Sequence, residues 1–393
     1  MSSRVSAAQA VSVRLTGNGE GVQKRLSGPL RRPQSMQYFV ILTKECNLFC
    51  AYCGGGSDTP PKEIQYSLEE LQSFLSKDPD PILEFYGGEP LLRMAVMKKI
   101  VNGTRGRFAL QTNGTFLDRV EPRLLRKLQT ILVSIDGTES VTDRERGKGV
   151  YQRAMRNVAA VRETGYRGDV VARMTVVQGS DIFESVTHLL GAGLFDHVHW
   201  QLSFSMFWRS DVTEPGLQEW LSRYNAGVSS LVAWWVDEME RTGVVPGIVP
   251  FIGITRSLLS GTKAGLRCGS GDDFYAIMPD GRISACPVSV DFDFSVVGSL
   301  RTHTPESLPK VKVGEPCTSC DIFGICGGRC LFVNQSQGLL RDGAYAEICG
   351  TVKHLVSELQ RALPRVRALV DGGRIRGDDF LYPEFNNGCE IIP

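Results

Sequence analysis

The sequence lacks both a strong net charge and long apolar runs. Its 393 residues carry 44 Lys and Arg against 43 Asp and Glu, so the formal net charge is only +1. A near-neutral chain has no basic surface of the kind that nucleic-acid binding needs, and we predict no nucleic-acid partner. The longest apolar runs are only as long as a strand, which predicts no membrane partner. Neither an internal repeat nor a low-complexity tract is present.

Cysteine is absent from long stretches of the chain and concentrated in two. The eleven cysteines gather at 46–53 and 268–349, with Cys389 alone near the end. Disulfide scaffolds are typical of small secreted domains, whereas this chain can bury a sizeable core and has no secretory signal. Clustered cysteines in such a chain indicate metal binding.

Residues 1–35 have few acids. They contain one acid, Glu20, and the basic residues Arg4, Arg14, Lys24, Arg25, Arg31 and Arg32 among many Ser, Gly and Ala. This composition predicts a disordered basic extension, and an organelle transit peptide is the alternative.

From residue 38, strand-sized apolar runs alternate with helical patterns. The expected strands are 38–43, 82–86, 107–112, 130–135, 170–177 and 198–203. The clearest helices are 67–77, which opens on a capping box of Ser67 and Glu70, 151–164, 181–190 and 217–242. This alternation predicts an α/β fold, a partial (β/α)6 barrel over 36–250 with its chemistry on the loops that follow the strands.

A second region follows the expected barrel. A Pro- and Gly-rich stretch at 243–253 is expected to separate the two. We then expect a cysteine-rich domain over 262–355, and a helical segment with the C-terminal tail over 356–393.

The first cysteine group directly follows the first expected strand. It reads Cys46-x3-Cys50-x2-Cys53, with Tyr52 before the last cysteine. Two cysteines at x2 spacing suit a zinc site or a redox pair, but three at this spacing fit neither. Three thiolates would hold a [4Fe–4S] cluster and leave one iron open to a small molecule.

This motif resembles the signature of the radical S-adenosylmethionine (SAM) superfamily. The resemblance implies that Cys46, Cys50 and Cys53 are catalytic and hold a [4Fe–4S] cluster whose open iron chelates the amino and carboxylate groups of SAM. It further implies that an electron from the cluster cleaves SAM to methionine and a 5′-deoxyadenosyl radical, which abstracts hydrogen from an unactivated carbon. Tyr52 is expected at the cluster edge, against adenine, or in the core.

The loop after the second expected strand supports this resemblance. Gly87, Gly88, Glu89 and Pro90 are similar to the family's motif for the SAM amino group. Glycines allow close backbone approach, and a carboxylate accepts from an ammonium group.

Later strands and loops supply further candidates for the SAM pocket. These candidates are Thr112, Asn113, Ser134, Asp136 and Arg173. Ser134 and Asp136 could bind ribose or carboxylate. Arg173 interrupts an apolar strand, so it needs a partner inside the barrel, either the SAM carboxylate or a structural ion pair.

The second cysteine region resembles the SPASM extension of radical SAM enzymes that act on peptides and proteins. It reads Cys268-x12-Gly281-x4-Cys286, then Cys317-x2-Cys320-x5-Cys326-x3-Cys330, then Cys349. Two zinc ribbons would need two Cys-x2-Cys pairs, and only Cys317 and Cys320 form one.

The resemblance implies two auxiliary [4Fe–4S] clusters. One would be held by Cys317, Cys320, Cys326 and Cys349, and the other by Cys268, Cys286 and Cys330. Some relatives have one more cysteine shortly after the first, which this chain lacks. The second cluster therefore has an open iron or a remote fourth ligand such as Cys389.

The expected function is modification of a peptide or protein side chain, at or near cysteine, as in maturation of ribosomal peptides. Formylglycine formation in sulfatases is an alternative, although Pro287 stands where that group has an aspartate. A multi-cluster electron carrier is the non-enzymatic alternative. The expected partners are the peptide and an electron donor such as ferredoxin or flavodoxin, in an anaerobic cytoplasm.

Overall fold

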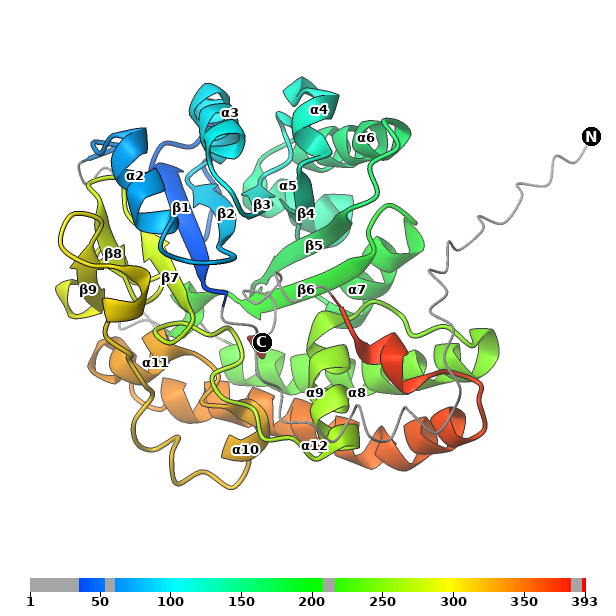
Figure 1. Cartoon of the computed structure of the whole chain (residues 1–393). Helices are drawn as coiled ribbons and strands as arrows, with labels where there is room; N and C mark the ends of the chain where they lie inside the picture. The colour runs from blue at the N-terminus through cyan, green and yellow to red at the C-terminus, as the bar shows by residue number, and fades with distance from the viewer. Residues whose placement is uncertain (1–34, 54–60, 208–215, 383–390) are drawn as a thin grey trace, which may run out of the picture.

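A computed structural model of the chain describes residues 35–53, 61–207, 216–382 and 391–393 (Figure 1). The predictions for residues 1–34 and for Cys389 lie outside these ranges. The six predicted strands are confirmed as β1 (Gln37–Thr43), β2 (Ile82–Gly87), β3 (Arg107–Thr112), β4 (Leu128–Ser134), β5 (Asp169–Val176) and β6 (His197–Leu202). They pair in parallel in the order β6-β5-β4-β3-β2-β1. This curved parallel sheet is the partial barrel that the sequence predicts.

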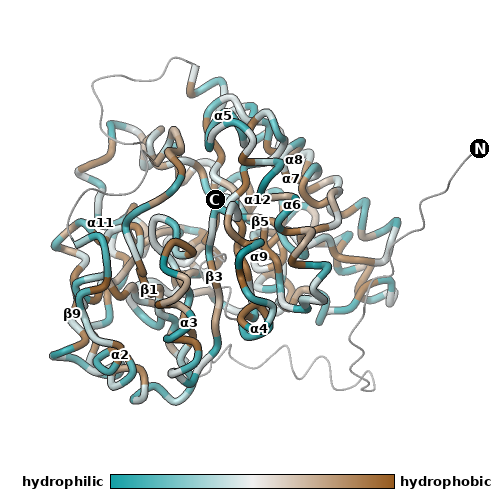
Figure 2. The backbone as a smooth tube through the Cα atoms, turned by 90° about the horizontal axis from the view of Figure 1, so that it is seen from above, coloured by the Kyte–Doolittle hydropathy of each residue, from teal (hydrophilic) through white to brown (hydrophobic). Residues whose placement is uncertain are grey.

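Helices connect these strands and cover the outer face of the sheet (Figure 1). They are α2 (Leu68–Leu75), α3 (Met94–Gly103), α4 (Pro122–Leu125), α5 (Glu139–Arg146), α6 (Val150–Glu163) and α7 (Ile182–Gly191). The predicted capping box opens α2, since the Ser67 hydroxyl accepts from the amide of Glu70 at 3.1 Å. In Figure 2 the strands are mostly hydrophobic, whereas the helices alternate between hydrophilic and hydrophobic residues. The core therefore lies between the sheet and the apolar faces of these helices.

The cysteine-rich region extends the same sheet. Strand β7 (Phe274–Ile277) pairs in parallel with β1, and β8 (Arg282–Ser284) and β9 (Val296–Ser299) continue in antiparallel pairing. On the inner face, Phe39 and Ile41 of β1 pack with Phe274 and Ala276 of β7 in a small second core. The second cysteine region is thus built directly onto the first strand of the barrel.

A helical layer lies below the sheet in Figure 1. It contains α8 (Leu217–Thr242), as predicted, together with α9 (Val249–Ser260), α10 (Phe323–Cys326), α11 (Leu331–Gln335) and α12 (Ala344–Asp371). The expectation of an irregular linker over 243–253 is wrong in its second half, because α9 starts at Val249. Its Pro250 lies in the first turn, where proline costs no hydrogen bond. Within the described ranges, no helix is both long enough and apolar enough to cross a bilayer.

The last three residues lie at the mouth of the barrel (Figure 1). The Ile391 carbonyl accepts from Nε2 of His199 at 2.9 Å and from the Gln201 amide at 3.3 Å. Ile392 is fully buried. The last three residues are therefore held against β6 by these two hydrogen bonds.

Candidate functional site

The structure brings the three cysteines of the first group together at the carboxyl end of β1. Cys50 is buried, Cys46 is half-buried and Cys53 is exposed. Burial raises the pKa of the Cys50 thiol to about 11, and the neighbouring Cys53 and Cys46 raise it further. The three thiols are therefore close enough to affect one another's charge, as three ligands of one group must be.

Two glycines let the loop after β2 dock on this cysteine loop. The amide of Gly88 donates to the Thr43 carbonyl and the amide of Glu89 to the Glu45 carbonyl, both at 2.8 Å. A Cβ atom on Gly88 would lie 2.2 Å from the Glu45 carbonyl oxygen. Gly87 has φ +140°, and a Cβ atom there would lie 2.1 Å from the Thr43 oxygen. The motif predicts that its glycines lie close to another backbone segment. In the structure that segment is residues 43–45 of this chain.

The carboxylate of Glu89 accepts several hydrogen bonds from other residues of this chain. Its side chain is 0% exposed, and Oε1 accepts from the Leu91 amide at 2.9 Å and the Thr112 hydroxyl at 2.8 Å. Oε2 accepts from the Asn113 amide at 2.8 Å. A carboxylate has about four acceptor positions, so about one remains for a ligand. Glu89 and Thr112 thus also hold the neighbouring loops together, and their binding of SAM stays a prediction.

Asn113 contacts the cysteine loop directly. Its side-chain amide nitrogen lies 3.8 Å from Sγ of Cys46 and 2.9 Å from Oδ1 of Asn47. Its amide oxygen accepts from the backbone and hydroxyl of Thr115. Asn113 therefore places an amide donor near one of the three thiols, and its part in the SAM pocket stays a prediction.

Asp136 forms a buried ion pair that the sequence did not predict, and its predicted role in binding ribose or carboxylate stays a prediction. Its two oxygens lie 2.7 and 2.8 Å from nitrogens of Arg146, with the two side chains 0% and 6% exposed. The same oxygens accept from the Tyr52 hydroxyl at 3.0 Å and the Thr175 amide at 2.9 Å. These donors occupy the carboxylate. Tyr52 is half-buried, with the Arg146 guanidinium 5.5 Å from its ring centre, and its place at the cluster edge, against adenine or in the core stays a prediction.

Arg146, at the end of α5, was not found from the sequence. Its positive charge lowers the pKa of the Cys50 thiol, against the larger effect of burial. The ion pair joins α5 to the loop after β4, and its effect on Cys50 depends on α5 folding back over the cysteine loop. No local pattern in the sequence indicates that contact.

The barrel interior contains a cavity with two charged residues. The residues that line it are Phe39, Glu84, Tyr86, Gln111, Leu132, Arg173, Cys268, Ser270, Phe274, Cys286, Pro287, Val288, Cys330, Leu331 and Ile391. Arg173 lies inside the barrel, as predicted, where it contacts Nδ1 of His199 and lowers the pKa of Glu84. Ser134 ends β4 and is the register partner of Arg173. The binding of SAM by Arg173 and Ser134 remains a prediction.

Glu84 was missed, although it interrupts an apolar strand just as Arg173 does. The side chain is 1% exposed, and Oε2 accepts from the Gln37 amide at 2.8 Å. Oε1 has no hydrogen-bond partner among the described residues. Burial raises the pKa of this carboxyl to about 8, against the opposing effect of Arg173. A buried, partly unsatisfied carboxyl in a cavity is typical of a functional site.

Cys268, Cys286 and Cys330 meet at the far side of this cavity. They lie before β7, after β8 and at the start of α11. Burial, together with the charges of Cys330 and Cys268, raises the pKa of Cys286 to about 12. Ile391 lines the same cavity, whereas Cys389, two residues earlier, lies outside the described ranges.

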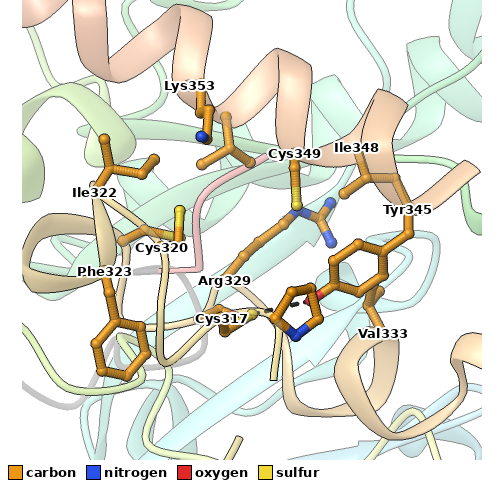
Figure 3. A pocket seen from close by; sticks show the side chains of 14 residues that line it. Cys317, Cys320, Ile322, Phe323, Arg329, Val333, Tyr345, Ile348, Cys349 and Lys353 are labelled. Atoms are coloured by element: carbon orange, nitrogen blue, oxygen red, sulfur yellow. Dashed lines mark hydrogen bonds between the residues drawn. The ribbon is translucent and has the colours of Figure 1, made fainter. Parts of the chain in front are cut away.

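The remaining four cysteines line a separate pocket, which we call the four-cysteine pocket (Figure 3). They are Cys317, Cys320, Cys326 and Cys349. Burial raises the pKa of Cys349 to about 11, with further increases from Cys317, Cys326 and Cys320. The Tyr345 hydroxyl lies 2.9 Å from Sγ of Cys317. The later cysteines thus lie in the two groups that the sequence predicts, three in the barrel cavity and four in this pocket.

The donor atoms of all three groups are thiols, the ligands that iron–sulfur clusters use. Within the described residues, no three His, Cys, Asp or Glu side chains converge closely enough to hold a single metal ion. The chemistry of the donors therefore fits iron–sulfur clusters, which place their thiolates on different irons.

For the first cysteine group, comparison with known proteins supports this chemistry. Residues 40–187 match the model of the radical SAM superfamily. An uncharacterized protein of Archaeoglobus fulgidus is 26% identical over 333 residues, which cover 79% of this chain and 78% of that protein. The AdoMet-dependent heme synthase of Methanosarcina barkeri is 34% identical over 137 residues, or 32% of this chain and 38% of the synthase.

Solved structures share the fold across both regions. The structure of anSMEcpe with bound AdoMet has a TM-score of 0.70 at 18% identity, covering 87% of this chain and 100% of its own. Streptococcus suis SuiB bound to S-adenosylmethionine has a TM-score of 0.53 at 14% identity, covering 79% of this chain and 75% of SuiB. These likenesses show a partial barrel with an attached cysteine-rich region.

Proposed function

On the premise that this chain is a radical SAM superfamily protein, with residues 40–187 as its radical SAM domain, we propose that it modifies a side chain of a peptide or protein. The observation that carries this proposal is the interior cavity. It extends from barrel residues such as Arg173 and Glu84 to a second group of cysteines, Cys268, Cys286 and Cys330.

Cys46, Cys50 and Cys53 would hold the [4Fe–4S] cluster that binds SAM. When bound, that cluster supplies the electron that cleaves SAM to methionine and a 5′-deoxyadenosyl radical. The chain's own residues fix this site, since Gly87, Gly88 and Asn113 hold the cysteine loop in place. Inside the barrel, Arg173 offers a cation for the SAM carboxylate, and the free acceptor position of Glu89 remains for the ammonium group.

Two auxiliary [4Fe–4S] clusters would occupy the later cysteine groups. The four-cysteine pocket supplies a thiolate for each of four irons, whereas Cys268, Cys286 and Cys330 supply three. The group with three thiols opens onto the barrel cavity. We therefore assign to that cavity the substrate side chain, in particular a cysteine whose thiolate can complete the group.

A peptide substrate is supported by the nature of the similar structures. One structure of anSMEcpe holds both AdoMet and the Cp18Cys peptide, with a TM-score of 0.63 and 17% identity over 86% of this chain and 99% of its own. Where sulfatase-maturing enzymes have an aspartate, this chain has Pro287, which lines the cavity together with the carboxyl of Glu84. Glu84 lines the cavity in which the substrate would lie, and its ionised form would accept a proton there, with a pKa that burial raises to about 8.

Iron content tests the cluster assignment. The wild type, reconstituted without oxygen, should hold about twelve irons per chain, which is four for each cysteine group. Alanine variants of all cysteines of one group should each lose about four irons and keep the others. A wild-type chain with about four irons would contradict the assignment of the later groups.

A peptide with deuterium on the β-carbon of its only cysteine tests the substrate. Incubation with SAM and dithionite should transfer deuterium into 5′-deoxyadenosine, which mass spectrometry detects. The same peptide with serine in place of cysteine is the control and should transfer less. SAM cleavage without deuterium transfer from any cysteine peptide of a diverse set would refute modification at cysteine.

A further inference from the structure

The four-cysteine pocket contains one buried cation, Arg329. Figure 3 shows its guanidinium group beside Cys349, and Arg329 lines the pocket together with all four cysteines. The remaining lining is largely apolar, with residues such as Ile322, Val333 and Ile348, and Lys353 also lines the pocket. Arg329 is therefore placed among thiols and apolar groups, away from bulk water.

Within the part of the chain that the structure describes, no carboxylate compensates this charge. Arg329 is 8% exposed, and among the described residues its Nε atom has no hydrogen-bond partner and no carboxylate forms an ion pair with it. An isolated charge in a protein interior is strongly unfavourable, and buried arginines are normally paired. The buried charge of Arg329 therefore needs an anionic partner other than a carboxylate.

The backbone at Arg329 is also strained. Arg329 has φ +51°, and it is the only described residue other than glycine with a positive φ. Such a conformation persists only where the surroundings impose it, and it is concentrated at functional sites. The strained backbone therefore places the Arg329 side chain in the four-cysteine pocket, between Cys326 and Cys330 in the sequence.

We propose that Arg329 is the counter-charge of an iron–sulfur cluster in the four-cysteine pocket and raises the reduction potential of that cluster. The inference rests on the proposed cluster at Cys317, Cys320, Cys326 and Cys349. Four thiolates give such a cluster a net negative charge, and reduction adds another. A cation in a medium of low dielectric constant stabilises the more negative, reduced state.

Lys353 provides the matched control within the same pocket. Its ammonium group is close enough to Cys349 to interact with it electrostatically, but the side chain is 48% exposed and pairs with Asp321 at 2.8 Å. Solvent screens such a charge, so its removal should matter much less than removal of Arg329.

The test is a redox titration of the reconstituted full chain, followed by electron paramagnetic resonance. In Arg329→Met, one midpoint potential should fall by at least the equivalent of a tenfold change in the reduction equilibrium, which is 59 mV for one electron. Arg329→Lys and Lys353→Met should stay close to the wild type. Equal potentials in Arg329→Met and the wild type would overturn the proposal, as would an equal fall in Lys353→Met.

Thermal unfolding provides a second, independent test. Arg329→Met should unfold at a lower temperature than the wild type when the clusters are loaded. After removal of iron by a chelator, the order should reverse, because the cation is then unpaired in the wild type. A structural role in packing would lower the midpoint in both states, and that result would refute the proposal. If Arg329→Met does not fold, Arg329→Lys replaces it in the test. Iron content and midpoint potential equal to those of the wild type would support the role of charge, and a fall in either would refute it.

Iron content separates this inference from the assignment on which it rests. If replacement of Cys317, Cys320, Cys326 and Cys349 together by alanine loses no iron, no cluster is present in the pocket and both proposals fail. If this variant loses iron but Arg329→Met keeps the wild-type potential, only the inference about Arg329 fails.

Discussion

The substitution Glu84→Gln should change how the stability of the protein depends on pH. Burial raises the pKa of Glu84 from 4.5 to about 8, and Oε1 has no partner among the described residues. The folded protein therefore binds this proton more tightly than the unfolded chain does. The free energy of unfolding must consequently fall as the pH rises from about 4.5 to about 8.

The size of the effect follows from these two pKa values. Ionisation of Glu84 should lower the free energy of unfolding by about 2 kcal/mol at pH 6 and by about 4–5 kcal/mol at pH 8.5. Between these pH values the wild type should thus lose about 2–3 kcal/mol that Glu84→Gln keeps. Glutamine can still accept the hydrogen bond from Gln37, so the remaining contact of the side chain is preserved.

Urea unfolding of the reconstituted protein, followed anaerobically by tryptophan fluorescence at both pH values, measures this difference. Glu163→Gln is the control, because Glu163 lies exposed on the surface of α6. That variant should follow the wild type. If Glu84→Gln also follows the wild type between pH 6 and 8.5, Glu84 is not a buried carboxyl with a raised pKa, and its proposed part in proton transfer has no basis.

Three further substitutions test the contacts around the site. Gly88→Ala forces a Cβ atom to 2.2 Å from the Glu45 carbonyl, so we expect loss of about four irons in an iron assay, and full iron would contradict this. Asp136→Asn leaves the Arg146 charge buried without its partner and should cost about 3–5 kcal/mol in urea unfolding. A cost below about 1 kcal/mol, the value typical of exposed pairs, would show that the pair is solvated. Removal of residues 391–393 exposes the apolar surface that the fully buried Ile392 covers and should lower the free energy of unfolding by about 1.5–3 kcal/mol. An unchanged midpoint of thermal unfolding would contradict this.

The sequence predicts the framework of the fold well, because the framework depends on local patterns. Strand-length apolar runs and helical periodicity identify the six parallel strands and α8. The capping box of Ser67 and Glu70 locates the start of α2. Proline is ambiguous, however, since Pro250 reads as a linker residue and is found in the first turn of α9.

The roles of charged residues in the site were predicted less well, because they depend on contacts between distant loops. Glu89 and Asp136 are correctly placed near the three cysteines, yet their oxygens mainly bind backbone amides and Arg146. Glu84 could have been found by the rule that identified Arg173, a charge within an apolar strand. The burial of Arg329 could not, because it results from the packing of the four-cysteine pocket.

The most direct test of the central claim is SAM cleavage by the reconstituted chain with dithionite, compared with a variant in which Cys46, Cys50 and Cys53 are all alanine. Release of 5′-deoxyadenosine by the wild type and none by the variant is the predicted result. No release from an iron-loaded wild type, or equal release from both proteins, would contradict the assignment of these three cysteines as the SAM-cleaving site.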